Sequence, residues 1–186
     1  KKKFKHDSYT LSNDHFSIEN NYIHIPKLGK VKLAEKLRFE GKLLWATVSR
    51  IADKWYVSIS VELDKPLTFS KTKKQGAEGV DFGLSNYAVM STGETIKGPK
   101  PHKQLLLRLK RLSRSFSRKK KGSNNSKKAK EKLSKLHARI HNIRNDAQHK
   151  FTTAKTKAHT LLVIEDLNVQ GMLKNRRLSR SVADMG

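Results

Sequence analysis

Residues 161–166 of the chain read Leu161-Leu162-Val163-Ile164-Glu165-Asp166, four apolar side chains followed directly by two acids. A short continuous apolar run after a long helical pattern is typical of a strand buried on both faces of a sheet. An acid placed directly after such a strand must lie at the edge of the sheet or be paired, because burying an isolated carboxylate is costly. The pattern therefore predicts that Glu165 ends a buried strand. The alternative is that Glu165 or Asp166 caps a helix in the segment that follows.

A second acid ends an earlier predicted strand. The segment Gly79-Val80-Asp81-Phe82-Gly83 has the composition of a short strand, and residues 86–90 and 94–96 predict two more around a turn at Thr92-Gly93. A strand that carries an acid, followed by two antiparallel strands, predicts a mixed sheet. Together with the helices described below, this sheet predicts an α+β or mixed α/β fold. Taken alone, Asp81 is also explained as a turn acid, or as the start of the phosphate loop of an actin-like ATPase. The ATPase reading requires Ser, Thr and Gly downstream, whereas this chain becomes strongly basic.

The two acids together predict a metal site. If strands 79–83 and 161–164 are parallel neighbours, the carboxylates of Asp81 and Glu165 emerge at the same end of the sheet. Carboxylate oxygens are ligands suited to Mg²⁺ or Mn²⁺. A pair of such ions can stabilise the attacking and leaving oxygens in phosphodiester cleavage. We therefore expect Asp81 and Glu165 to be metal-binding, catalytic residues.

Two helices are predicted between these strands. Leu105, Leu109, Leu112 and Phe116 recur at helical spacing, and a longer apolar stripe runs from Ala129 to Ala158 in steps of three or four residues. Residues 119–126 separate the stripes and have the composition of a loop. The economical arrangement is an antiparallel helical hairpin at about residues 103–158, with the two stripes packed together.

The predicted hairpin is strongly basic. Residues 100–150 contain eighteen Lys and Arg and only two acids, whereas a merely solvated helix face usually mixes charge signs. Phosphate binding explains this bias better, because neutralised phosphates release counterions; it does not distinguish RNA from DNA. The expected nucleic-acid-binding residues are Arg108, Lys110, Arg111, Arg114, Arg118, Lys119, Lys120, Lys121, Lys127, Lys128, Lys132, Lys135, Arg139, Arg144, Arg176 and Arg177.

An N-terminal β domain is predicted before the sheet that carries Asp81. Leu44, Ala46 and Val48 alternate with more polar neighbours, and a second alternating run starts at Trp55 after a turn at residues 52–54. Several short strands with turns between them predict a small barrel or sandwich, with or without a ligand. We expect this β domain at residues 1–69, a polar linker at 70–77 and a second domain at 78–186.

Composition narrows the class of protein. The chain has 186 residues and a formal charge of +25, which makes a polyanion the obvious partner, and at 35% hydrophobic residues it can bury a core. It has no cysteine, which excludes disulfides, thiolate zinc sites and a cysteine nucleophile within these residues. No apolar run approaches the roughly 18 residues of a membrane helix. These features predict an intracellular nucleic-acid protein with no membrane partner.

Several of these segments resemble the TnpB/OrfB proteins of bacterial insertion sequences, a family known as transposases and similar to the type V CRISPR effector nucleases. The matching segments are 79–86 around Asp81, the basic loop at 118–125, residues 163–172 around Glu165, and 175–181. The resemblance covers roughly residues 40–186. It implies a RuvC-like nuclease domain of RNase H fold, preceded by a barrel called the wedge domain. It also implies a guide RNA from the mobile element, a target DNA beside a short flanking motif, and a prokaryotic, nucleoid-associated location in the cytoplasm.

The resemblance also assigns the acids. Asp81 matches the first RuvC carboxylate and Glu165 the second, with Mg²⁺ as cofactor. The family's third catalytic Asp and its four-cysteine zinc finger lie beyond the segments matched here, so zinc is expected only in that missing part. We therefore expect an incomplete RuvC fold in a fragment that is inactive alone. The alternative is a non-catalytic nucleic-acid-binding relative, either repressor-like or decayed.

Overall fold

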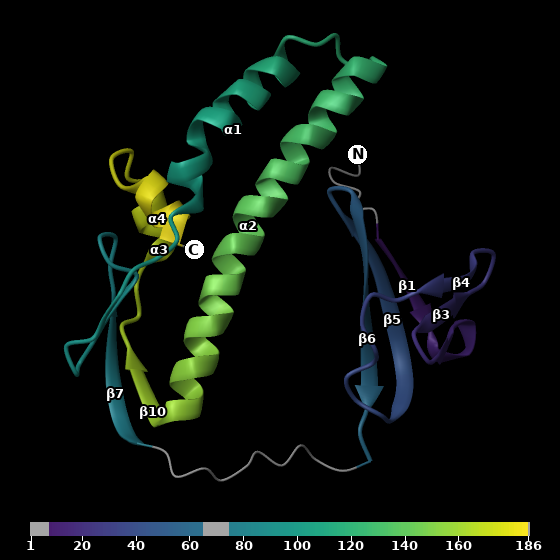
Figure 1. The fold of residues 1–186 in the computed structure, drawn as a ribbon, viewed down its shortest axis with the longest axis horizontal. Coiled ribbons are helices and arrows are strands. Elements are labelled where there is room, and N and C mark those ends of the chain that lie inside the picture. Colours follow the sequence, from purple (N-terminus) through teal and green to yellow (C-terminus); the bar gives the residue numbers. More distant parts are fainter. Residues whose placement is uncertain (1–7, 65–74, 186) are drawn as a thin grey trace. The chain divides into compact units, whose positions relative to one another are not determined.

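The computed structural model describes residues 8–64 and 75–185, which belong to two compact units divided between residues 69 and 70 (Figure 1). Unit 1 contains two antiparallel three-stranded sheets, ordered β1-β5-β6 and β2-β3-β4. Its elements are β1 (Ser8–Ser12), a 3₁₀ turn (Asn13–His15), β2 (Ser17–Glu19), β3 (Tyr22–Ile25), β4 (Gly29–Lys32), β5 (Lys42–Ile51) and β6 (Lys54–Glu62).

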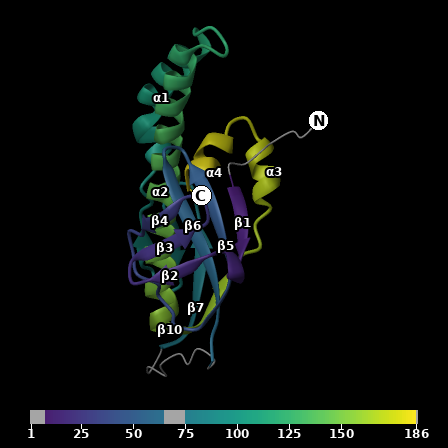
Figure 2. The ribbon, with the colours of Figure 1, turned by 90° about the vertical axis from the view of Figure 1, so that its right-hand side faces the viewer.

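Figure 2 shows the strands of the two sheets of unit 1. The two sheets share one core, in which Ile23 and Ile25 from β3 pack with Ala46 and Val48 from β5 and with Phe16. The predicted β5–β6 hairpin is confirmed, with Ile51 paired to Lys54 across a two-residue turn. The predicted barrel is wrong for the described residues, since β1 and β6 each pair on one side only and the two sheets do not join. Barrel closure requires hydrogen bonds between edge strands, which the alternation within single strands does not specify.

Unit 2 combines one sheet with four helices. Its sheet is mixed, with the order β10-β7-β8-β9, a parallel β10–β7 pair and antiparallel pairs elsewhere. The elements are β7 (Gln75–Phe82), β8 (Ala88–Met90), β9 (Thr95–Ile96), α1 (Pro101–Ser117), α2 (Asn124–Ala158), β10 (His159–Ile164), α3 (Val169–Lys174) and α4 (Ser179–Met185). β7 begins at Gln75, so residues 75–77 form part of a strand and not of the predicted linker; residues 70–74 lie outside the described residues.

The helical hairpin is present as predicted. α1 and α2 pack side by side and are joined by residues 118–123 (Figure 1). Leu136 and Ile140 of α2 are buried, as their stripe positions predict. α2 begins at Asn124 because the Ser123 hydroxyl accepts a hydrogen bond from the Ser126 amide at 3.1 Å, the usual N-cap arrangement. None of the helices that the structure describes is apolar over a length sufficient to cross a bilayer.

One face of the sheet packs against α2. Val80, Ala88 and Met90 form the buried core of this face, and the rings of Phe82, Tyr87 and Phe151 contact it. These three rings meet edge to face with centroids 5.4 to 6.0 Å apart. The aromatic contact attaches α2 to β7 and to the residue that precedes β8, and therefore fixes the helix over the strand that carries Asp81.

The strand predicted at residues 161–164 is confirmed, but its burial on both faces is not. Leu161, Val163 and Ile164 expose 56%, 56% and 61% of their surface. β10 occupies the edge of the described sheet and pairs only with β7. The apolar run correctly indicated a strand, but it could not indicate what covers that strand.

Candidate metal and nucleic-acid site

The parallel pairing of β10 with β7 ends one residue before the two predicted acids. Val163 pairs with Gly79 and Ile164 pairs with Val80. Extending this register by one residue places Glu165 beside Asp81, at the carboxyl ends of both strands. The parallel pairing on which the metal-site prediction depended is therefore confirmed.

Alternation along β7 sets the face on which Asp81 lies. Val80 and Phe82 belong to the face that packs under α2, and successive residues of a strand point to opposite faces. Asp81 therefore points to the face away from α2, and its side chain is exposed. Glu165 directly follows the last residue of β10 and is exposed as well. Both carboxylates are accessible to a solvated cation and to a phosphate group.

The donor set fits a hard cation with an incomplete protein shell. Mg²⁺ is commonly held by one or two carboxylates, with waters and substrate phosphates completing an octahedron. Asp81 and Glu165 supply this number of carboxylates. Within residues 8–64 and 75–185 no group of three or more His, Asp or Glu side chains is placed to hold a metal ion. The chemistry of these two side chains therefore fits part of a magnesium site.

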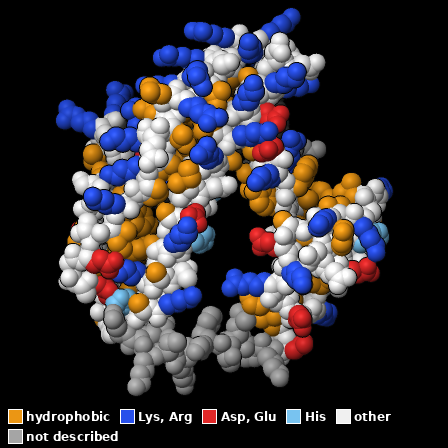
Figure 3. Space-filling view, viewed as in Figure 1, with side chains coloured by type: hydrophobic (Ala, Val, Ile, Leu, Met, Phe, Trp, Pro, Cys, Tyr) orange, Lys and Arg blue, Asp and Glu red, His pale blue; other side chains and the backbone are white. Residues whose placement is uncertain are grey.

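Basic side chains gather along the hairpin (Figure 3). All the predicted nucleic-acid-binding residues are exposed except Arg144, which is half-buried. A groove of about 680 Å³ runs along α1 and is lined by Leu107, Lys110, Arg111, Arg114, Ser115, Arg118 and Lys119. A smaller pocket of about 300 Å³ lies between the helices near their loop, where Lys119, Lys128 and Lys132 converge. Cationic grooves with little acidic compensation attract phosphate backbones.

Two of the predicted phosphate ligands make contacts within the protein. Lys135 forms an ion pair with Glu131, with 2.8 Å between its Nζ and the carboxylate. Arg144 donates a hydrogen bond to the carbonyl of Ala183 in α4. Sequence spacing placed both on the basic face of the helix, but it carried no information about the position of α4.

Asp184 is a structural residue that the sequence pattern did not identify. Its buried carboxylate accepts hydrogen bonds from the backbone amides of His102 and Lys103, at 2.6 and 2.8 Å. These amides belong to the first turn of α1, whose N-cap residue, Lys100, has a left-handed backbone and offers no side-chain cap. The missing local cap before Pro101 was the available indication that a distant acceptor is needed.

The sequence pattern also did not identify a buried polar cluster around Glu78 of β7. Glu78 is 3% exposed and His159 is 7% exposed, and the Glu78 carboxylate contacts both the His159 ring and the Thr92 hydroxyl. Glu78 precedes the strand that the sequence predicted at residues 79–83, so nothing in its local pattern indicated burial.

Comparisons of the sequence with known proteins match this chain to one family. The family model OrfB_IS605, described as "Probable transposase", matches residues 58–176. The "Putative RNA-guided DNA endonuclease InsQ" of Escherichia coli (strain K12) is 38% identical over 157 residues, which cover 84% of this chain and 39% of that protein. A protein of Streptomyces pristinaespiralis named "Putative RNA-guided DNA endonuclease" is 40% identical over 142 residues, 74% of this chain and 34% of that protein.

A more distant relative shows the same extent of overlap. The "Putative RNA-guided DNA endonuclease MT2953" of Mycobacterium tuberculosis (strain CDC 1551 / Oshkosh) is 27% identical over 173 residues, 86% of this chain and 38% of that protein. The chain thus spans about two fifths or less of the length of these relatives. Because the family model covers well over half of the chain, and the Escherichia coli relative matches most of it, the chain belongs to the OrfB_IS605 family of probable transposases.

Proposed function

We propose that this chain supplies two metal-binding carboxylates and a nucleic-acid-binding hairpin to an RNA-guided DNA endonuclease associated with a mobile element. The observation that carries the proposal is the parallel register of β7 and β10, whose continuation by one residue would set Glu165 beside Asp81. The names of the relatives support guide RNA and target DNA as partners. The RuvC-like fold expected from the family resemblance is part of this proposal.

The roles of the residues follow from their chemistry. Asp81 and Glu165 would hold Mg²⁺ or Mn²⁺, which when bound acts as a Lewis acid on phosphate oxygens. Both carboxylates are exposed, which leaves room for the nucleic acid beside them. Arg111, Arg114 and Arg118 of the α1 groove would bind backbone phosphates and hold the strand in register.

The proposal includes inactivity of these 186 residues alone. Nucleases of this type use carboxylates from several elements, and the described residues offer two at the site. The same observation favours the second candidate function, a relative that binds nucleic acid without cutting it. The two candidates differ in whether the complete gene product hydrolyses DNA.

A plasmid cleavage assay tests the proposal. The complete gene product would be co-expressed with RNA from the end of its element, purified, and incubated with plasmid carrying the matching target. Cleavage that requires both Mg²⁺ and the RNA supports the endonuclease, and the 186-residue chain should bind the nucleic acid without cutting it. Tight, salt-sensitive binding by the complete product with no cleavage under any metal would instead establish the binding module.

A further inference from the structure

The register of β10 depends on few side chains. Of its six residues only His159 is buried and only Leu162 is half-buried. A strand's register is strongly specified where a buried face must match its neighbour, and weakly specified where most side chains are exposed. β10 therefore has little apolar burial to hold it in one alignment with β7.

This alignment determines the geometry of the proposed metal site. Each residue of a strand advances about 3.3 Å, so a slip of two residues would move Glu165 about 6.6 Å along Asp81's strand. Two carboxylates separated by that extra distance cannot share one cation, because Mg²⁺–oxygen distances are about 2.1 Å. A contact that fixes the register would therefore affect metal binding without touching the metal.

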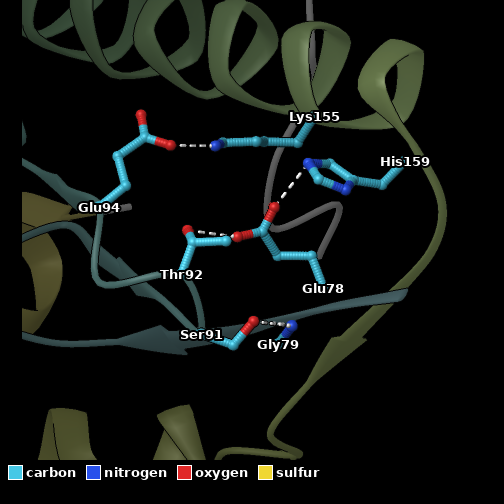
Figure 4. A network of polar contacts seen from close by, with 7 residues as sticks. All are labelled: Glu78, Gly79, Ser91, Thr92, Glu94, Lys155 and His159. Atoms are coloured by element: carbon cyan, nitrogen blue, oxygen red, sulfur yellow. Dashed lines mark hydrogen bonds and ion pairs between the residues drawn. The ribbon is translucent and has the colours of Figure 1, made fainter. Parts of the chain in front are cut away.

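The buried cluster of Glu78, His159 and Thr92 makes such a contact between the two strands (Figure 4). The Glu78 carboxylate of β7 lies 2.5 Å from Nε2 of His159, the first residue of β10. Its other oxygen accepts a hydrogen bond from the Thr92 hydroxyl at 2.8 Å. Both carboxylate oxygens of Glu78 are thus satisfied inside the protein, which makes its burial tolerable.

The cluster also attaches β7 to the turn between β8 and β9. The Ser91 amide donates to the Gly79 carbonyl at 2.9 Å, and the Gly79 amide donates to the Ser91 hydroxyl at 3.1 Å. Glu78 and Gly79 are therefore fixed on the β8 side, while His159 is fixed to Glu78 on the β10 side. The contact between Glu78 and His159 thus joins the two strands, three residues before Asp81 on β7 and six residues before Glu165 on the β10 side.

We infer that Glu78 and His159 are positioning residues, which hold β10 in the register that makes Asp81 and Glu165 a single cation site. The inference rests on the proposed metal site, because it assigns the pair a role in building that site. Thr92 supports the pair by holding the second oxygen of Glu78.

Mn²⁺ binding to the 186-residue chain tests the inference, with affinity measured by the electron paramagnetic resonance signal of free Mn²⁺. We expect His159→Ala and Glu78→Ala each to weaken binding about tenfold, in the range typical of residues that support metal ligands indirectly. The double variant should be little worse than either single one, since both changes remove the same contact. His159→Gln keeps an N–H donor for Glu78 and should restore most of the affinity.

A matched control separates positioning from general stability. Lys155 of α2 forms an ion pair with Glu94 at 2.5 Å, which joins the helix to the β8–β9 turn without touching β7 or β10 (Figure 4). Glu94→Gln should leave the Mn²⁺ affinity unchanged at a temperature where circular dichroism shows every variant folded. Equal affinity in wild type, His159→Ala and Glu78→Ala would overturn the inference, as would an equal loss in Glu94→Gln.

Failure of the proposed function gives a different result. If Asp81→Asn binds Mn²⁺ as well as wild type does, the metal-site assignment is wrong, and if the 186-residue chain binds no Mn²⁺, the same comparison is made with the complete gene product. Amide hydrogen exchange then tests the register directly. Among residues 161–164, the amides that are protected in wild type should exchange at least tenfold faster in His159→Ala and not in Glu94→Gln, since only alternate amides of an edge strand bond to its partner. Unchanged exchange in His159→Ala would refute the positioning role.

Discussion

Glu78 and Asp81 lie three residues apart on one strand, and their surroundings give them different roles. Alternation turns Glu78 toward the face covered by α2, where His159 and Thr92 occupy both of its oxygens. Asp81 turns to the opposite face and stays exposed. The position of Asp81 was predictable because an acid after apolar residues marks a strand end. The role of Glu78 was not, because its partners come from positions 14 and 81 residues further along the chain.

Arg139 and Arg144 lie on the same helix but should respond differently to substitution. Arg144→Ala removes the hydrogen bond to the Ala183 carbonyl and should lower the free energy of unfolding by about 1 kcal/mol. Arg139→Ala should leave stability unchanged and weaken nucleic-acid binding. Urea denaturation and fluorescence anisotropy with labelled RNA measure the two effects. Equal stabilities for both variants would show that the Arg144 contact contributes nothing.

Tyr87 should make stability depend on pH in alkaline solution. Burial raises the pKa of Tyr87 above its usual 10.0, and the hydrogen bond with the Gln148 side chain partly opposes this shift. The unfolded chain therefore releases the phenolic proton at lower pH than the folded chain does. Stability should fall as pH rises from the unfolded pKa toward the folded one.

A difference titration checks this expectation. The phenolate absorbance of wild type minus that of Tyr87→Phe should titrate above pH 10.0 in the folded protein and shift downward in urea. A folded-state midpoint equal to the urea value would contradict the effect of burial.

At the scale of elements, the helices were the most predictable part of the chain. The apolar stripes that end at Phe116 and Ala158 correspond to helices that end at Ser117 and Ala158. The start of α2 at Asn124, inside the segment predicted as a loop, follows from the Ser123 cap. Periodicity reports which face is apolar, whereas a cap can extend a helix into a polar segment without changing that periodicity.

The α1 groove should dominate the salt dependence of nucleic-acid binding. A triple variant with Arg111→Gln, Arg114→Gln and Arg118→Gln should flatten the slope of log affinity against log salt by about 2 to 3, or 0.7–0.9 per lost phosphate contact. Filter binding between about 50 and 200 mM salt covers the informative range.

Unit 1 offers a control with the same charge change. Lys27, Lys32 and Lys36 are exposed and lie outside the hairpin. Their replacement by Gln should alter the slope by less than about 1. If both triple variants lose the same slope, net charge and not the α1 groove controls binding.

At the scale of the whole molecule, single strands were predicted better than their partners. The alternation in residues 44–63 gave the β5–β6 hairpin, because its partners are adjacent in the chain. Pairing β1 with β5, or β10 with β7, joins segments more than 30 residues apart, and no local pattern encodes that choice. The prediction of a closed barrel was wrong because it required such long-range pairings between strands. The β10–β7 pair succeeded because the acids at both strand ends suggested a shared site.

The overlap with relatives sets the context for the proposed chemistry. This chain covers 39% of the Escherichia coli protein and 34% of the Streptomyces pristinaespiralis protein. A nuclease site completed by residues outside that share is consistent with the described residues, among which no group of three or more His, Asp or Glu side chains is placed to hold a metal ion. The contribution proposed for this chain is the pair Asp81 and Glu165 together with the basic hairpin.

The assignment of these two acids is tested by cleavage with the complete gene product and its RNA. Asp81→Ala and Glu165→Ala should each reduce the Mg²⁺-dependent cleavage rate at least a thousandfold, on the order of 4 kcal/mol in the barrier, while RNA affinity stays within about twofold of wild type. Each substitution would thus remove DNA hydrolysis while leaving RNA binding intact. Cleavage by Asp81→Ala at the wild-type rate would contradict the account.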